Sequence, residues 1–212
     1  MFKTIKEAEA VAYTLSSPSK MPCFSYSIPA QKCITGGKLK SVANSICSKC
    51  YAWNRGRYAF SNVKDALNKR FQSLTNPLWV DAMVYMIGKR EKSGFFRWHD
   101  SGDLQSVEHL EKIAEVCRRL PHIKFWLPTR EYATVSKWME ANVVPENLII
   151  RLSALMFDAP GPAAIAKRLG LTTSGASSGE DFTCPASKQE GKCQDCRSCW
   201  DKNIANVNYK KH

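Results

Sequence analysis

The chain has 212 residues, and 31 lysines and arginines against 19 acidic residues give it a formal net charge of +12. A hydrophobic fraction of 44% excludes a disordered or collagen-like chain. No run of about 18 apolar residues occurs, and the charged N-terminus lacks the apolar core of a secretory signal. We therefore expect a soluble cytoplasmic protein without a membrane partner, and the positive charge favours a polyanion such as nucleic acid as a partner.

Three cysteines near the N-terminus form the first notable feature, namely Cys33, Cys47 and Cys50. Cytosolic thiols stay reduced, so clustered cysteines indicate metal chemistry sooner than disulfides. Three thiolates can hold a [4Fe-4S] cluster and leave one iron open to a ligand. Alternatively, Cys23 joins as a fourth ligand of a closed, structural zinc or iron site. Because Cys23 lies between Pro22 and Phe24, we expect it to be buried beside the site instead.

The middle of the chain alternates between helical and extended patterns. Residues 61–92 have helical periodicity with a break at Asn76-Pro77, and a short aromatic strand is predicted at residues 94–98. A polar turn over residues 99–103 then precedes a helix that opens at Ser106. Cys117 occupies an apolar position of this helix, so we interpret it as a buried core thiol.

Two more strands are predicted at residues 123–127 and 148–155, with helices at residues 132–142 and 162–169. This alternation predicts an α/β fold with a parallel sheet or partial barrel. In such folds ligands bind outside the carboxyl ends of the strands. We expect seven polar side chains to lie at this edge of the sheet, namely His99, Asp100, Asp103, Thr129, Arg130, Arg151 and Ser153. In a purely structural interpretation, Asp100 and Ser101 turn the chain and Arg151 pairs with Asp100.

The second cysteine group is C-terminal and consists of Cys184, Cys193, Cys196 and Cys199. Three cysteines separated by two residues each, with a remote fourth followed by proline, are typical of a [4Fe-4S] site. Four thiolates also bind structural zinc, and disulfides or an unmetallated tail are further alternatives. The segment is short and polar, so we expect a metal to supply its folding energy. We accordingly divide the chain into residues 1–178, an α/β domain, and residues 179–212, a cysteine-rich segment packed on it.

Together, these motifs resemble the phage protein family known as gene product 88. The resemblance rests on the spacing of Cys33, Cys47 and Cys50 before Tyr51-Ala52, the 99–103 turn, residues 128–131, and the C-terminal cysteines. More distantly, the first element is similar to radical S-adenosylmethionine proteins, whose three cysteines are spaced Cys-x3-Cys-x2-Cys, whereas 13 residues separate Cys33 from Cys47 here. The resemblance implies a partial parallel (β/α) barrel with a metal-stapled C-terminal loop, in the cytoplasm of a host bacterium.

The resemblance also implies a function. It predicts an iron–sulfur protein of radical S-adenosylmethionine type with one or two [4Fe-4S] clusters, an unidentified substrate and an unidentified reductant protein. The residues expected to contact S-adenosylmethionine are Asp100, Ser101, Gly102, Asp103, Arg130 and Arg151. The alternative is a non-catalytic iron–sulfur or zinc protein that binds nucleic acid or transfers electrons.

Overall fold

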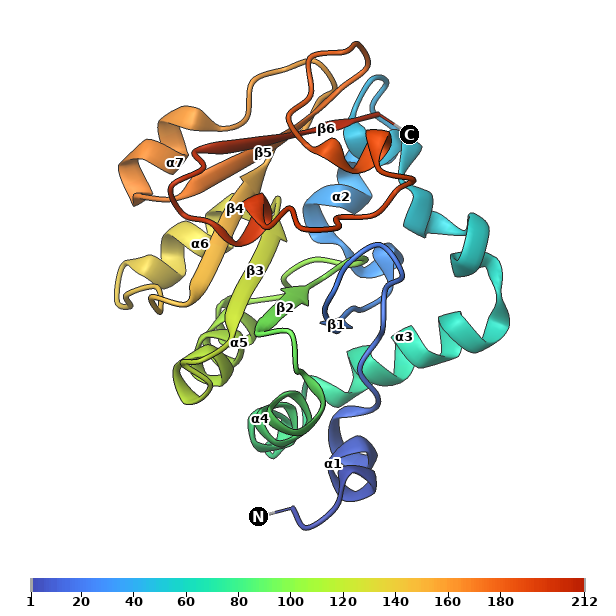
Figure 1. The fold of residues 1–212 in the computed structure, drawn as a ribbon, viewed down its shortest axis with the longest axis vertical. Helices are drawn as coiled ribbons and strands as arrows, with labels where there is room; N and C mark the ends of the chain where they lie inside the picture. Colours follow the sequence, from blue (N-terminus) through green and yellow to red (C-terminus); the bar gives the residue numbers. More distant parts are fainter. Residues whose placement is uncertain (1, 212) are drawn as a thin grey trace.

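The computed structural model describes residues 2–211. Within them a parallel sheet of six strands forms the centre of the molecule, and neighbouring strands in the sheet are consecutive in the chain (Figure 1). The strands are β1 (Ser25–Tyr26), β2 (Phe95–Trp98), β3 (Lys124–Thr129), β4 (Leu148–Ser153), β5 (Thr172–Ser177) and β6 (Asn206–Lys210). All five strand pairs are parallel. The predicted α/β class with a parallel sheet is therefore confirmed.

The three predicted strands correspond to β2, β3 and β4. Every residue of β4 is buried, which agrees with a strand covered on both faces. The sequence analysis did not predict β1, β5 or β6. β1 has only two residues, and β5 and β6 are rich in small and polar side chains that lack a strand pattern. Over residues 2–211 the sheet is open, with β1 and β6 at its edges, and closure towards a barrel stays a prediction.

The helices are α1 (Ile5–Ala12), α2 (Ile34–Leu39), α3 (Ser61–Ser73), α4 (Trp79–Arg90), α5 (Val107–Arg119), α6 (Tyr132–Met139) and α7 (Ala163–Leu169). The predicted break separates α3 from α4, because Pro77 cannot supply the backbone N–H that a continuous helix needs. Ser106 caps α5, and its hydroxyl accepts from the backbone N–H of His109 at 3.1 Å. The helices predicted after β2, β3 and β4 are thus confirmed.

Helices α4 to α7 pack against one another in sequence and cover one side of the sheet (Figure 1). Between them and the strands lies the main core, which contains fully buried side chains such as Trp79, Trp98 and Phe125. Cys117 is part of this core with no exposed surface, so its assignment as a core thiol is confirmed. The segment with the first cysteines and α2 lies across the carboxyl ends of the strands instead.

The C-terminal segment is integrated into the sheet. Residues 206–210 form β6, which pairs with β5 over five residues. Trp200 is 3% exposed, and its indole N–H donates to the carbonyl oxygen of Phe96 at 2.8 Å. Part of the segment beyond residue 178 therefore folds on the same sheet through ordinary strand pairing and burial. Within residues 2–211 no helix has the length and apolar composition needed to cross a membrane.

Candidate functional site

A cavity of about 440 Å³ lies at the carboxyl ends of the central strands. Residues at or just after the ends of β2, β3 and β4 line it, including His99, Asp100, Ser101, Gly102, Asp103, Arg130 and Ser153. Six further lining residues are cysteines, Cys33, Cys47 and Cys50 from the first group and Cys184, Cys193 and Cys199 from the second. Cysteine groups that are far apart in the sequence thus face one cavity together with the polar strand ends.

The first cysteine group is built on short helical turns. Cys33 is the N-cap residue of α2, Cys47 lies in a 3-10 turn (Ile46–Lys49), and Cys50 follows that turn directly. The backbone N–H of Cys50 donates to the carbonyl oxygen of Cys47 at 3.1 Å. Glu131 ties this segment to the end of β3, because both its carboxylate oxygens accept from Thr35 at 2.8 Å.

Gly36 lies directly against two of these thiols. A Cβ atom at this position would lie 3.0 Å from Cys33 Cβ, 3.4 Å from Cys47 Sγ and 3.7 Å from Cys33 Sγ. The sulfurs of Cys33 and Cys47 therefore both lie beside the Cα of Gly36, and a larger residue would crowd them. A glycine that keeps side-chain volume away from adjacent thiols fits a cofactor held at this place.

The second cysteine group surrounds the other side of the cavity. Cys199 Sγ lies 3.3 Å from the Tyr209 hydroxyl, and the backbone N–H of Cys184 donates to Asn208 O at 2.9 Å. Cys23 belongs to this side, since it packs with Trp126 and Trp200 and the charge of Cys193 contributes to raising its pKa. It is 5% exposed, as expected for a buried thiol, but it lies beside the second group and not the first.

Burial controls the protonation of these thiols. It raises the pKa of Cys199 to about 11 and that of Cys23 to about 12. Burial also raises the pKa of Cys33, and the negative charges of Asp103, Cys50 and Cys47 raise it further. All nine cysteines are free thiols. Without a metal the buried thiols of Cys23, Cys33 and Cys199 stay protonated at neutral pH, whereas a bound cation displaces such protons because it stabilises the thiolates.

Within residues 2–211, no three His, Cys, Asp or Glu side chains converge on the position of a single metal ion. The metal ligands predicted from the sequence, including Cys196, therefore stay predictions, as does the metal-stapled loop. The donor set itself fits an iron–sulfur cluster, since thiolates are its usual ligands and several thiols face one cavity.

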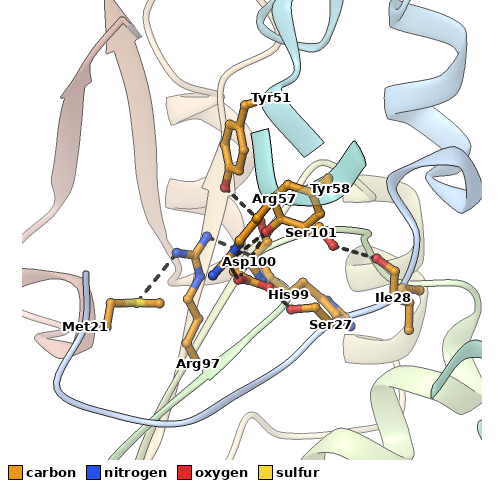
Figure 2. A network of polar contacts seen from close by, with 10 residues as sticks. All are labelled: Met21, Ser27, Ile28, Tyr51, Arg57, Tyr58, Arg97, His99, Asp100 and Ser101. Carbon is orange, nitrogen blue, oxygen red and sulfur yellow. Dashed lines mark hydrogen bonds and ion pairs between the residues drawn. The ribbon is translucent and has the colours of Figure 1, made fainter. Parts of the chain in front are cut away.

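Asp100 is the centre of a polar network that holds the cysteine segment against β2 (Figure 2). Its carboxylate accepts from Ser27, from Arg57 at 2.5 Å and from the Tyr58 hydroxyl at 3.2 Å. Its carbonyl oxygen accepts from the Tyr51 hydroxyl at 2.8 Å. The side chain is 95% buried and fully engaged, so its role in the structure is to position the turn after β2.

The same turn depends on Gly102. Its φ of 78° lies in the left-handed region, and a Cβ there would lie only 2.3 Å from Ile28 Cγ1. The neighbouring Ser101 hydroxyl donates to Ile28 O at 2.8 Å (Figure 2). Close backbone packing at Ile28 therefore requires glycine and fixes the cavity wall.

Asp103 connects the ends of β2 and β3. Its carboxylate accepts from the Thr129 hydroxyl at 2.6 Å and from the backbone N–H of Arg130 at 2.9 Å, and burial raises its pKa to about 6. Arg130 Nε donates to Ala154 O at 3.0 Å, whereas no residue within 2–211 accepts from its two terminal nitrogens. Its positive charge acts on Cys33 and Cys47. Arg130 therefore has donors available for an anion beside the first cysteine group.

Arg151 is placed differently from the other predicted contacts. It is fully buried in β4, and its five N–H groups donate to five carbonyl oxygens, those of Thr173, Ser198, Cys199, Asp201 and Ile204. With every donor engaged, Arg151 anchors the C-terminal loop to the sheet. The alternative ion pair with Asp100 is not formed, since Asp100 pairs with Arg57.

Sequence reasoning missed Arg97 as a site residue. It lies in β2, lines the cavity, and stacks over Trp126 with 4.4 Å between the guanidinium carbon and the ring centre. Its position between Phe96 and Trp98 was the available signal, because a charged residue in an apolar strand needs a specific environment. The basic residues that line the cavity, within the part of the chain described, are Lys20, Lys49, Arg55, Arg97, Arg130, Lys210 and Lys211. The acidic ones are Asp100 and Asp103.

Comparison with known proteins gave a family match. The family model described as gene product 88 matches residues 2–202, which is nearly the whole chain. No curated protein and no solved structure matches the chain.

Proposed function

Because the chain belongs to the gene product 88 family, we propose that it is a phage or prophage iron–sulfur protein of radical S-adenosylmethionine type. The proposal combines the thiolate donor set of two cysteine groups with a cavity at the carboxyl ends of parallel strands. In this proposal Cys33, Cys47 and Cys50 hold one [4Fe-4S] cluster. Cys184, Cys193, Cys196 and Cys199 hold a second cluster or, alternatively, zinc.

One observation carries the proposal. Cys33, Cys47 and Cys50 face the cavity together, while Cys23, the candidate for a fourth ligand, packs with Trp126 on the side of the second group. Three protein thiolates leave one iron of a cubane without a protein ligand. A small molecule in the cavity can then bind there.

When bound, the cluster would supply one electron; in radical enzymes such an electron cleaves S-adenosylmethionine into methionine and a 5′-deoxyadenosyl radical that abstracts hydrogen. This chain's residues bind and orient the reactants. Arg130 offers its two terminal nitrogens to a carboxylate on the side of Cys33 and Cys47. Asp103 and Gly102 line the wall next to it, and Asp100 and Ser101 keep that wall in place through their bonds to Ser27 and Ile28.

The experiment is iron and sulfide analysis of protein purified without oxygen, followed by electron paramagnetic resonance of the reduced protein. We expect S-adenosylmethionine to change the spectrum and 5′-deoxyadenosine to form on turnover. Replacing Cys33, Cys47 or Cys50 by serine removes the first cluster, because a hydroxyl is a far more basic ligand than a thiol. Cys117→Ala is the matched control, since this thiol lies in the core away from the cavity. Protein that lacks iron contradicts the proposal.

Nucleic-acid binding without catalysis is the second candidate, favoured by the basic residues around the cavity. A nucleic-acid complex loses affinity with salt, with a log–log slope of roughly −0.7 to −0.9 per neutralised phosphate. Absence of binding to single- and double-stranded DNA and RNA at low salt removes this candidate.

Electron transfer is the remaining alternative. It is supported if the protein contains iron but S-adenosylmethionine does not change the electron paramagnetic resonance spectrum.

A further inference from the structure

Arg97 is a cation without a carboxylate partner. No salt bridge involves it among residues 2–211. Its terminal nitrogens make only long contacts, at 3.6 Å to Met21 Sδ and 3.4 Å to His99 O (Figure 2). Its Nε is buried and has no partner in the described chain. Arg97 is half-buried and faces the cavity, and a partly desolvated charge without a partner is costly, so a ligand in the cavity that supplies the missing acceptor explains this arrangement best.

The two carboxylates that line the cavity with Arg97 are not available to it. Asp100 is engaged by Ser27, Arg57 and Tyr58, and Asp103 accepts from Leu104, Thr129 and Arg130. The remaining charges on the cavity wall are basic. Seven basic residues thus line the cavity against two acidic ones, and of the seven only Lys210 forms a salt bridge within residues 2–211.

Trp126 fixes the orientation of the Arg97 guanidinium. The guanidinium carbon lies 4.4 Å from the centre of the indole ring, and Trp126 is 4% exposed. A guanidinium held over an aromatic ring loses little further freedom on binding, and its planar fork of N–H groups matches two oxygens of a carboxylate or phosphate. The site is thus shaped for an oxyanion.

Arg97 and Arg130 act on different sides of the cavity. Arg97 influences Cys193 and Cys199, whereas Arg130 influences Cys33 and Cys47. We infer that the cavity binds a substrate carrying a carboxylate or phosphate group and that Arg97 binds this group beside the second cysteine group. That the bound molecule is a substrate rests on the proposed function, in which S-adenosylmethionine binds at Arg130. The presence of an oxyanion site at Arg97 does not rest on the proposed function.

The experiment uses the full chain purified without oxygen, with iron measured on every sample. Thermal unfolding is followed while inorganic phosphate or acetate replaces chloride at constant ionic strength. An anion that binds the folded state raises the melting temperature in a saturable way. We expect such a rise with at least one of the two anions, and the anion with the higher affinity identifies the substrate group.

Arg97→Gln is expected to weaken this binding at least tenfold. Arg97→Lys keeps the charge but not the fork, so its affinity falls less, and this variant serves if the first one does not fold. Arg55→Gln is the matched control, because Arg55 is an exposed residue of the same cavity wall. Binding that is unchanged in Arg97→Gln, or no rise with either anion, overturns the inference.

Iron content separates this inference from the proposed function. Saturable binding that depends on Arg97 in protein without iron supports the oxyanion site and contradicts the iron–sulfur proposal. Iron-loaded protein whose anion binding does not depend on Arg97 supports the iron–sulfur proposal and overturns the oxyanion site.

Discussion

Arg151 Nε lies 3.1 Å from the carbonyl oxygen of Cys199, so a strand residue holds the backbone of a proposed metal ligand. Three of the other four donors of this guanidinium bind carbonyl oxygens of the loop from Ser198 to Ile204, and the fourth binds the carbonyl oxygen of Thr173 in β5. This part of the loop thus has an anchor that does not depend on a metal.

Arg151→Met is therefore expected to destabilise the protein by about 3–5 kcal/mol, because it leaves several buried carbonyl oxygens without donors. Chemical denaturation measures the change. Arg168→Met, on the exposed surface of α7, should cost less than about 0.5 kcal/mol. Equal stability of the two variants would show that Arg151 is not an anchor.

The cysteine loop itself gives a second prediction. Cys196→Ala should lose one metal site and make residues 184–197 sensitive to protease, since this segment has few buried apolar residues. Residues 200–210 should stay protected through Trp200 and β6. Limited proteolysis with metal analysis tests both parts, and an unchanged metal content would refute the assignment of Cys196 as a ligand.

Two adjacent glycines of α2 provide a matched pair. Gly36→Ala places a methyl group 3.4 Å from Cys47 Sγ, whereas a Cβ at Gly37 meets nothing within 4 Å. Alanine favours a helix over glycine by about 0.5–1 kcal/mol, so Gly37→Ala should be as stable as the wild type or more stable. We expect Gly36→Ala to lower iron occupancy and Gly37→Ala to leave it unchanged, as measured by iron content. Equal occupancy in both variants would argue against a cofactor between Cys33 and Cys47.

Asp100 should matter more for stability than its ion-pair partner. Asp100→Ala removes the buried acceptor of Ser27 and Tyr58 and should cost about 2–4 kcal/mol. Arg57 is half exposed, so Arg57→Gln should cost less than about 1 kcal/mol. Urea unfolding compares the two variants, and a larger loss in Arg57→Gln would contradict this order.

Two buried histidines predict a loss of stability in acid. Burial lowers the pKa of His109 to about 3 and that of His99 well below 6.5, and their rings lie 5.4 Å apart. Below pH 6.5 the unfolded chain binds protons that the folded chain does not, so stability falls as the pH decreases towards 3. Asp103 has the opposite effect, because its pKa is raised from 3.8 to about 6 in the folded chain. As the pH falls from about 6 to 3.8 the folded chain binds this proton first, which stabilises it and offsets part of the loss.

His109→Gln should remove roughly 3 kcal/mol of the loss between pH 6.5 and 4. Denaturation curves at several pH values measure this dependence. If the free energy of unfolding of this variant depends on pH as that of the wild type does, protonation of His109 on unfolding is not a cause of the acid destabilisation.

The local pattern of the chain determined the α/β class, three central strands, the helices around them and the burial of Cys117. These features follow from the spacing of apolar residues, which is a local property of the sequence and can be read without knowledge of the fold. The same pattern missed β5 and β6, because their small and polar residues become strand residues only through pairing within the sheet.

Only the tertiary structure decided how the candidate site is arranged. The sequence identified two cysteine groups, but their common cavity depends on the C-terminal segment returning to pair with β5. It likewise could not separate Arg130, which has free donors beside the first cysteines, from Arg151, whose donors are all bound to carbonyl oxygens. In the sequence each arginine lies in or directly after an apolar strand pattern. Their surroundings come from residues distant in the chain, and a side chain's partners determine what it can bind.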